Sequence, residues 1–272
     1  MEPTLTKAPQ EGEFALRRLT RNRPLMFLIA WGIAILVWML VSTLTDLPAF
    51  ILPKPADVWR KFLEVLGNGI LWRNFSYTLL EIALGLLIGS VSATVLAYWL
   101  ARKPLAERLL SPFLVASQSV PIVAVAPLLV IWLGPGLGTK VFICALTVFF
   151  PILINTLVGF REVSRDLREV MHALRATPKQ TLRYLEWPAA LPVIMAGLRV
   201  GATLSVIGAI VGELIGSDQG LGFLINVGRG QYDTALVFVA VFTLMLLASS
   251  FYGLILLVES RVLVWQTWRK GI

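Results

Sequence analysis

Six long, nearly uncharged runs of mostly apolar residues constrain this chain more than any other feature. A hydrocarbon core about 30 Å thick is crossed by roughly 20 helical residues, because each residue of an α-helix rises about 1.5 Å. Runs of that length lie near residues 24–45, 77–101, 113–133, 141–160, 196–216 and 234–258. We therefore predict an all-α, polytopic membrane protein with six transmembrane helices.

The composition excludes several other classes of protein. Hydrophobic residues make up 57% of the 272 residues and charged residues only 15%, whereas a soluble domain is about 25% charged. Such a chain cannot cover a soluble fold with polar groups, and it is too apolar to be disordered. Cys144 is the single cysteine and His172 the single histidine. We therefore expect no intrachain disulfide and no metal site. The lack of clustered catalytic residues weakens a third alternative, an integral membrane enzyme, and we expect no catalytic residues and no enzymatic activity in this chain.

The first apolar run, 24–45, has two interpretations, because basic residues precede it as they would precede a signal peptide. The run is longer than the apolar region of a usual signal peptide. The residues around Val41–Asp46 also offer no small-x-small cleavage site. A retained membrane anchor is therefore the preferred interpretation.

The distribution of basic residues predicts the orientation in the cell membrane. The formal net charge is +8, and in membrane proteins the excess of Lys and Arg marks the cytoplasmic loops. With a cytoplasmic N-terminus, the inner segments hold 18 of the 24 basic residues and the outer segments hold 6. We therefore predict cytoplasmic tails at 1–23 and 266–272, flanking a transmembrane domain at 24–265. The charges then face anionic lipid, and no nucleic-acid partner is needed to explain them.

Two connections are too long to be simple turns. The outer connection, 46–76, predicts a short interfacial helix, because apolar residues recur at helical spacing at Val58, Phe62, Val65 and Leu66. The inner connection, 162–192, starts with a helix that has one apolar face, formed by Leu167, Val170, Met171 and Leu174.

The inner connection also contains a fresh helix start. In Thr177-Pro178-Lys179-Gln180, threonine at the N-cap, proline at the first helical position and glutamine at the third form a capping box. We expect the helix that begins there to be short and to end near Trp187, before Pro188. The pattern alone is compatible with a docking surface for another subunit and with a solvated loop that packs on its own membrane domain.

The stretch Glu169–Thr177, followed by the run Trp187-Pro188-Ala189-Ala190-Leu191-Pro192, resembles the EAA loop of binding-protein-dependent ABC transporter permeases. Glu169 matches the acid that opens the motif, and Leu191-Pro192 match its end. Two positions depart from the motif: Val170-Met171 replace a pair of small residues, and Arg175 stands where glycine is usual. Glycine breaks the helix there, and in this chain the Thr177-Pro178 start provides a break two residues later.

The resemblance covers about residues 24–265 and implies the permease fold of a type I ABC importer. It implies a complex with a second permease copy in a homodimer, two cytoplasmic ATPase subunits that use ATP and Mg²⁺, and an external solute-binding protein. No cofactor is implied for this chain, and no Walker A sequence occurs in it. By this resemblance, the residues that couple the permease to the ATPase are Glu169, Ala173, Leu174, Arg175, Ala176, Thr177, Leu191 and Pro192.

The fifth run and the loop after it resemble the nitrate, sulfonate and taurine group of these permeases. The residues that carry this resemblance are Gly197–Gly201, Val211–Gly216 and Gly220–Ile225. Within that group, Gly216–Gly222 and the Trp-Pro-Ala-Ala-Leu-Pro run are most similar to permeases for thiamine-pyrimidine precursors or riboflavin. Permeases for nitrate, sulfonate or taurine remain the alternative.

Glycines four residues apart share one helix face and let helix backbones approach closely. This spacing predicts tight packing, either within the subunit or against a second copy, at Gly85, Gly89, Gly197, Gly201, Gly208, Gly212 and Gly216. Pro121, Pro127 and Pro151 each remove a backbone donor and predict kinks in the third and fourth runs.

Four polar residues within the apolar runs are candidates for the translocation path. Glu81 and Glu213 lie at membrane depth, where a carboxylate faces either a wet cavity or a structural partner. Gln118 and Ser119 lie beside Pro121 and offer hydrogen bonds to a polar solute. If the two acids instead carried protons, the chain would be a secondary transporter, which is the rival function from another class.

Overall fold

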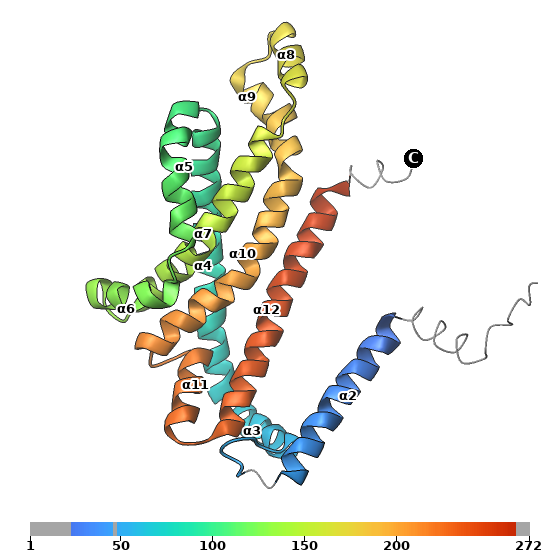
Figure 1. Ribbon diagram of the computed structural model, residues 1–272, viewed down its shortest axis with the longest axis vertical. Coiled ribbons are helices and arrows are strands. Elements are labelled where there is room, and N and C mark those ends of the chain that lie inside the picture. The colour runs from blue at the N-terminus through green and yellow to red at the C-terminus, as the bar shows by residue number, and fades with distance from the viewer. Residues whose placement is uncertain (1–22, 46–47, 265–272) are drawn as a thin grey trace, which may run out of the picture.

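The computed structural model describes residues 23–45 and 48–264, and all regular elements of that part are helical. The all-α prediction is therefore confirmed (Figure 1). In chain order the elements are α2 (Arg23–Leu44), α3 (Pro55–Gly67), α4 (Ile70–Ala101), α5 (Pro104–Gln118), α6 (Ile122–Leu133), α7 (Leu137–Arg161), α8 (Arg165–Ala173), α9 (Pro178–Thr181), the π-helical turn η1 (Leu182–Glu186), α10 (Trp187–Gly216), α11 (Leu221–Gly230) and α12 (Thr234–Val262).

In the described part of the chain, four helices are long and apolar enough to cross a membrane. They are α4, α7, α12 and the continuous helix Pro178–Gly216, which joins α9, η1 and α10. The pair α5 and α6 adds a fifth candidate span if its two helices are counted as one. The described apolar part of α2, Ile29–Leu44, is shorter than these candidates.

The third run is not the single helix that we expected over 113–133. Helices α5 and α6 meet at an angle of 97°. Pro121 is the N-cap of α6, in an extended conformation with ψ 117°, and a proline also disfavours helical backbone at the residue before it. Proline at this position therefore ends one helix and starts another rather than bending a continuous one.

Helix α7 is the centre of the bundle, packed between α4 and α10. At Gly208 of α10, an added Cβ would lie 2.8 Å from the Cα atom of Cys144 on α7, so that only glycine permits this approach. All seven glycines noted in the sequence face neighbours in the same chain, which is the intrachain alternative. The facing residues are Cys144 for Gly85 and Gly208, Val148 for Gly89, Asn155 for Gly197, Ile152 for Gly201, Lys140 for Gly212 and Val130 for Gly216.

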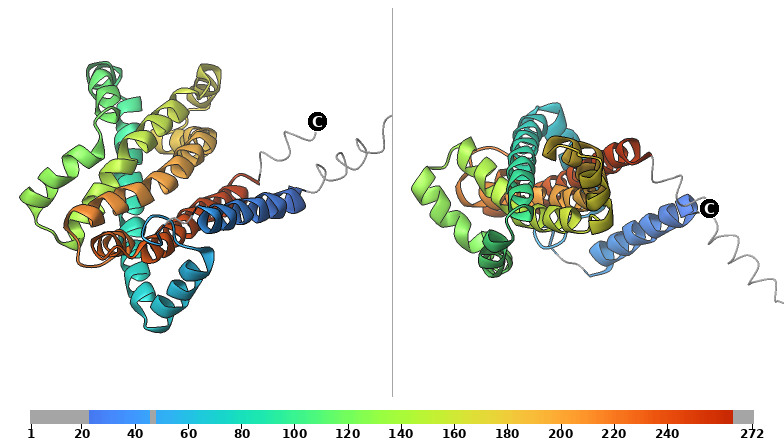
Figure 2. Two further views of the ribbon diagram at one scale, coloured as in Figure 1. Left: turned by 60° about the horizontal axis from the view of Figure 1, so that its bottom comes forward. Right: turned by 90° about the horizontal axis from the view of Figure 1, so that it is seen from above.

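Helices α3 and α11 lie at the opposite end of the bundle from α8 and α9 (Figures 1 and 2). The short helix predicted in the first long connection is present as α3, with Val58 and Val65 buried and Trp59 exposed. The Lys61 ammonium forms an ion pair of 2.9 Å with Asp233, the N-cap residue of α12. Its hydrogen bond to Asp233 raises the pKa of Lys61. This ion pair ties α3 to the start of the last helix.

Candidate functional site

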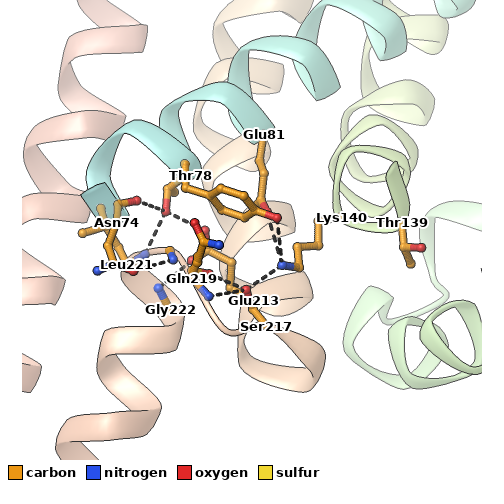
Figure 3. Close-up of polar contacts among 12 residues, drawn as sticks. Asn74, Thr78, Glu81, Thr139, Lys140, Glu213, Ser217, Gln219, Leu221 and Gly222 are labelled. Atoms are coloured by element: carbon orange, nitrogen blue, oxygen red, sulfur yellow. Dashed lines mark hydrogen bonds and ion pairs between the residues drawn. The ribbon is translucent and has the colours of Figure 1, made fainter. Parts of the chain in front are cut away.

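Glu213 lies at the centre of a buried polar cluster where α4, α7, α10 and α11 meet (Figure 3). Its side chain is 0% exposed. One carboxylate oxygen accepts a hydrogen bond of 2.5 Å from the Thr78 hydroxyl of α4, and the other accepts one of 2.5 Å from the backbone N–H of Gly222. Glu213 is therefore paired on both oxygens with groups of its own chain.

The same cluster caps the N-terminus of α11. The first N–H groups of a helix have no partner within the helix, and here side chains of α4 supply partners for two of them. Asn74 Oδ1 accepts from the N–H of Gly220 at 2.7 Å, and Thr78 Oγ1 accepts from the N–H of Leu221 at 2.8 Å. Gly220 has φ +110° and packs against the Glu213 carboxylate, so this position requires glycine.

Lys140 and Glu81 form the second half of the cluster. The Lys140 Nζ atom lies 3.8 Å from a carboxylate oxygen of Glu81 and donates a hydrogen bond of 2.5 Å to the Ser217 hydroxyl. It also lies 4.8 Å from the ring centroid of Tyr77, in cation–π geometry. Both partners of the ion pair are almost completely buried, with side chains 1% and 0% exposed.

Lys140 was not predicted as a site residue, because in the sequence it is one of the six basic residues of the outer segments. In the structure it lies in the first turn of α7 and packs inward. A signal was available. A lysine at the edge of an apolar run, at the depth of two unpartnered acids in other runs, is a candidate ion-pair partner.

Of the polar candidates, Gln118 lines a cleft, and Glu81 and Glu213 are not among the residues that line it. A cleft of about 460 Å³ lies between the α5–α6 bend and helices α7 and α10. Ser119, the other polar candidate beside Pro121, is exposed and outside the lining. The lining residues all lack a formal charge: Ser117, Gln118, Val120, Ile122, Val125, Leu146, Thr147, Phe150, Pro151, Leu204 and Ile207.

Helix α8 presents an apolar stripe that the described part of the chain leaves uncovered. Leu167, Val170 and Leu174 are 51%, 53% and 73% exposed. Glu169 lies on the same short helix and is also exposed. An exposed stripe of this kind on a helix at one end of a membrane bundle is a surface available to a partner.

The capping box predicted after α8 is present. The Thr177 N–H donates to Gln180 Oε1 at 2.7 Å, and the Gln180 N–H donates to Thr177 Oγ1 at 3.3 Å. The helix break, however, begins earlier than expected, at Arg175 itself, which has φ +53°. Hydrogen bonds from Arg175 N to His172 O and from Ala176 N to Met171 O complete a Schellman motif. Arginine thus adopts the conformation for which glycine is favoured.

The second helix of the loop does not end before Pro188, which corrects our expectation. It continues as Pro178–Gly216, with Pro188 in the first turn of α10 and Pro192 inside that helix. The π-helical turn Leu182–Glu186 ends two residues before Pro188. Such a turn changes the hydrogen-bond register and accommodates an interruption of the helical ladder without ending the helix. Leu191, at the predicted end of the motif, packs against Met195 and Leu263 rather than on α8.

Comparison with known proteins finds one family model and several related transport permeases. Residues 82–264 match the family model described as binding-protein-dependent transport system inner membrane component. The chain is 43% identical over 229 residues to the riboflavin transport system permease protein RibX of Chloroflexus aurantiacus, covering 84% of this chain and 85% of that protein. It is 32% identical to the formylaminopyrimidine transport permease protein ThiX of Halalkalibacterium halodurans, with 85% and 91% covered. It is 30% identical to the putative aliphatic sulfonates transport permease protein SsuC of Bacillus subtilis, with 88% and 87% covered.

Proposed function

The chain belongs to the family of binding-protein-dependent transport system inner membrane components. On that basis we propose which cleft the solute occupies and which surface of the chain docks on the ATPase. The chain is the permease subunit of an ABC importer in the inner membrane, and it is not itself an enzyme. ATP and Mg²⁺ are used by a separate ATPase, and the solute arrives on an external binding protein.

The proposed membrane topology has six spans. Helix α2 is the first span and the bent pair α5–α6 is the third, in addition to the four long helices. Both termini are cytoplasmic, as are α8 and α9, and α3 and α11 lie at the outer surface. A second copy of the chain completes the pathway as a homodimer surrounded by membrane lipid.

We propose that the inner loop, 162–192, docks on the ATPase through α8. The supporting observation is the exposed stripe Leu167, Val170 and Leu174. Glu169 adds a charge to this surface, while the residues from Ala173 to Thr177 form the turn that orients it.

The resulting experiment compares Glu169→Ala with Asp166→Asn, which neutralises another exposed acid of α8. In the reconstituted complex, Glu169→Ala is expected to reduce solute-stimulated ATP hydrolysis and transport at least fivefold, with unchanged abundance in the membrane. Asp166→Asn is expected to retain both activities. Unchanged coupling in Glu169→Ala would contradict the docking role of this residue.

We propose that the solute is uncharged and contains a flat heteroaromatic ring, as in riboflavin or an aminopyrimidine. The observation that carries this proposal is the cleft at the α5–α6 bend, whose lining has no formal charge and includes Gln118, Thr147 and Phe150. An anion such as a sulfonate would lose its hydration there without gaining a counter-charge, which is costly. The names of two relatives, the RibX and ThiX permeases, refer to ring compounds of this class.

Uptake by cells that express the complete transporter tests the solute class. Radiolabelled riboflavin is expected to accumulate, and an excess of unlabelled formylaminopyrimidine or taurine shows which competitors share the path. Uptake of labelled taurine without uptake of either ring compound would overturn the proposed class. Gln118→Ala is expected to reduce uptake at least threefold, whereas Ser119→Ala, outside the cleft lining, is expected to change it less than twofold.

A further inference from the structure

Glu186 is a buried acid of the inner loop. It is the last residue of the π-helical turn that precedes α10, and its side chain is 7% exposed. One carboxylate oxygen lies 2.7 Å from Nη2 of Arg102, at the C-terminal end of α4. The other lies 3.7 Å from Nη2 of Arg168 on α8. A single buried acid therefore bridges two arginines from different helices.

Arg168 extends this arrangement to a fourth element. Its Nη2 atom also donates a hydrogen bond of 2.8 Å to the backbone carbonyl of Phe160, in the last turn of α7. Arg102 in turn lies 5.0 Å from the ring centroid of Tyr98 on α4. Helices α4, α7, α8 and α10 are thus joined by charged side chains close to the α8 stripe.

The backbone at Glu186 is irregular, because this residue ends a π-helical turn. A π-helical turn inside a longer α-helix is an irregular segment that often occurs at functional sites. Here it lies within the continuous helix Pro178–Gly216, between the capping box of the inner loop and the part of α10 that lines the cleft. If both ion pairs of Glu186 stay intact, a displacement of α8 therefore moves the adjoining ends of α4 and α10 as well.

We propose that Glu186 is the positioning residue that transmits movement of α8 to α4 and α10. Its two ion pairs make the inner loop and the membrane helices move together. Because removing one member of a buried charge network leaves the others imperfectly paired, neutralising Glu186 should weaken the link from α8 to the adjoining ends of α4 and α10. The inference rests on the proposed docking of α8 on the ATPase.

The test is hydrogen–deuterium exchange of the complete permease–ATPase complex in nanodiscs, with and without ATP plus vanadate. In the unmodified complex, nucleotide trapping is expected to change exchange in α8 and in the adjoining ends of α4 and α10. In Glu186→Gln, the change in α8 is expected to remain while the changes in α4 and α10 fall at least threefold. Glu186→Asp, which retains the charge, is expected to restore at least half of the lost response.

Glu259→Gln is the matched control, because it neutralises a partly buried carboxylate of α12 that lies 3.2 Å from Arg199 of α10 and forms no ion pair with α8 in the described residues. It is expected to respond as the unmodified complex does. If Glu186→Gln does not assemble, Arg168→Gln is measured in its place, since Glu186 then still has Arg102 as a partner.

The outcomes separate the two proposals. An undiminished response of α4 and α10 in Glu186→Gln, or in Arg168→Gln where that variant is used, overturns the role of Glu186. A failure of Glu186→Asp to restore the response overturns it as well, because the proposal depends on the charge. Absence of any nucleotide-dependent change in α8 of the unmodified complex refutes the docking of the loop itself.

Discussion

Among single residues, Glu213 is a buried carboxylate at membrane depth whose two oxygens both have hydrogen-bond partners in the same chain. It accepts hydrogen bonds from the Thr78 hydroxyl and the Gly222 N–H, and the latter belongs to the first turn of α11. A negative group at a helix N-terminus is stabilised by the helix dipole and by the unpaired N–H groups. Glu81 is paired more weakly: it lies 3.8 Å from Lys140, and neither of its buried oxygens accepts a hydrogen bond in the part of the chain that the structure describes.

Glu213→Gln is expected to reduce the yield of folded protein and to destabilise it by about 1–3 kcal/mol. The reason is that the amide offers one acceptor oxygen in place of two, so either the Thr78 hydroxyl or the Gly222 N–H loses its acceptor at residue 213 and the buried cluster must rearrange its hydrogen bonds. Thermal unfolding in detergent measures the loss, and Asp218→Asn, an exposed acid close to the same cluster, is the control. Normal yield and stability combined with impaired uptake would instead place Glu213 in the translocation path.

Arg175 is a residue other than glycine in a left-handed backbone conformation. Its φ of +53° costs a residue other than glycine roughly 1–2 kcal/mol. Arg175→Gly is therefore expected to stabilise the end of α8 by up to about 1 kcal/mol, after allowing for the greater freedom of glycine in the unfolded chain.

Hydrogen exchange at the Arg175 and Ala176 amides, which donate to the last carbonyls of α8, measures the effect of Arg175→Gly as slower exchange. Arg183→Gly is the opposite control, because Arg183 is exposed and lies in the helical turn η1. Glycine at position 183 is expected to speed the exchange of the amides in η1, because glycine disfavours helix. Faster exchange in Arg175→Gly as well would show that the arginine side chain, rather than the backbone, determines the stability of this turn.

At the scale of helices, the packing of α7 against α4 and α10 holds the bundle together. Close approach depends on glycines, since lipid provides no hydrophobic force that drives apolar helices together. At Gly208 an added methyl group would lie 2.8 Å from both the Cα atom of Cys144 and the Oγ1 atom of Thr147. The α7–α10 interface therefore has no room for a larger residue.

Gly208→Ala is expected to destabilise the protein by about 1–3 kcal/mol, because overpacking forces the two backbones apart. Gly253→Ala in α12 is the control: an added Cβ there has no neighbour within 4 Å in the described part of the chain. It is expected to be neutral or slightly stabilising, since alanine favours helix over glycine. Thermal unfolding of the two variants side by side decides between packing and a general effect of alanine, and equal unfolding midpoints would contradict the packing argument.

At the scale of the whole molecule, the helix Pro178–Gly216 connects the two ends of the bundle. It begins at the capping box of the inner loop, passes Glu186 and the cleft, and ends beside the Glu213 cluster. A helix of 39 residues is about 58 Å long at about 1.5 Å per residue, more than the thickness of a bilayer. In the proposed arrangement, this continuity would carry a movement of the inner loop to the opposite end of the bundle.

The orientation of the molecule is tested by labelling. In a Cys144→Ala background, a cysteine introduced by Lys179→Cys is expected to react with a membrane-impermeant thiol reagent only from the cytoplasmic side. Arg229→Cys, an exposed position in α11 at the other end of the bundle, is expected to react only from outside. Labelling of Lys179→Cys in intact cells would overturn the proposed topology.

The helical class and the capping box at Thr177 were predictable from the sequence, because each depends on local spacing along the chain, and the permease family was predictable from the resemblance of the inner loop to a known motif. It did not determine the bend at Pro121 or the continuation of the helix through Pro188, since a proline permits a break, a kink or a helix start according to its neighbours. Only the tertiary structure paired Lys140 with Glu81 and turned all seven glycines inward. Those contacts join residues far apart in the chain, and periodicity within one helix carries no information about which other helix it faces.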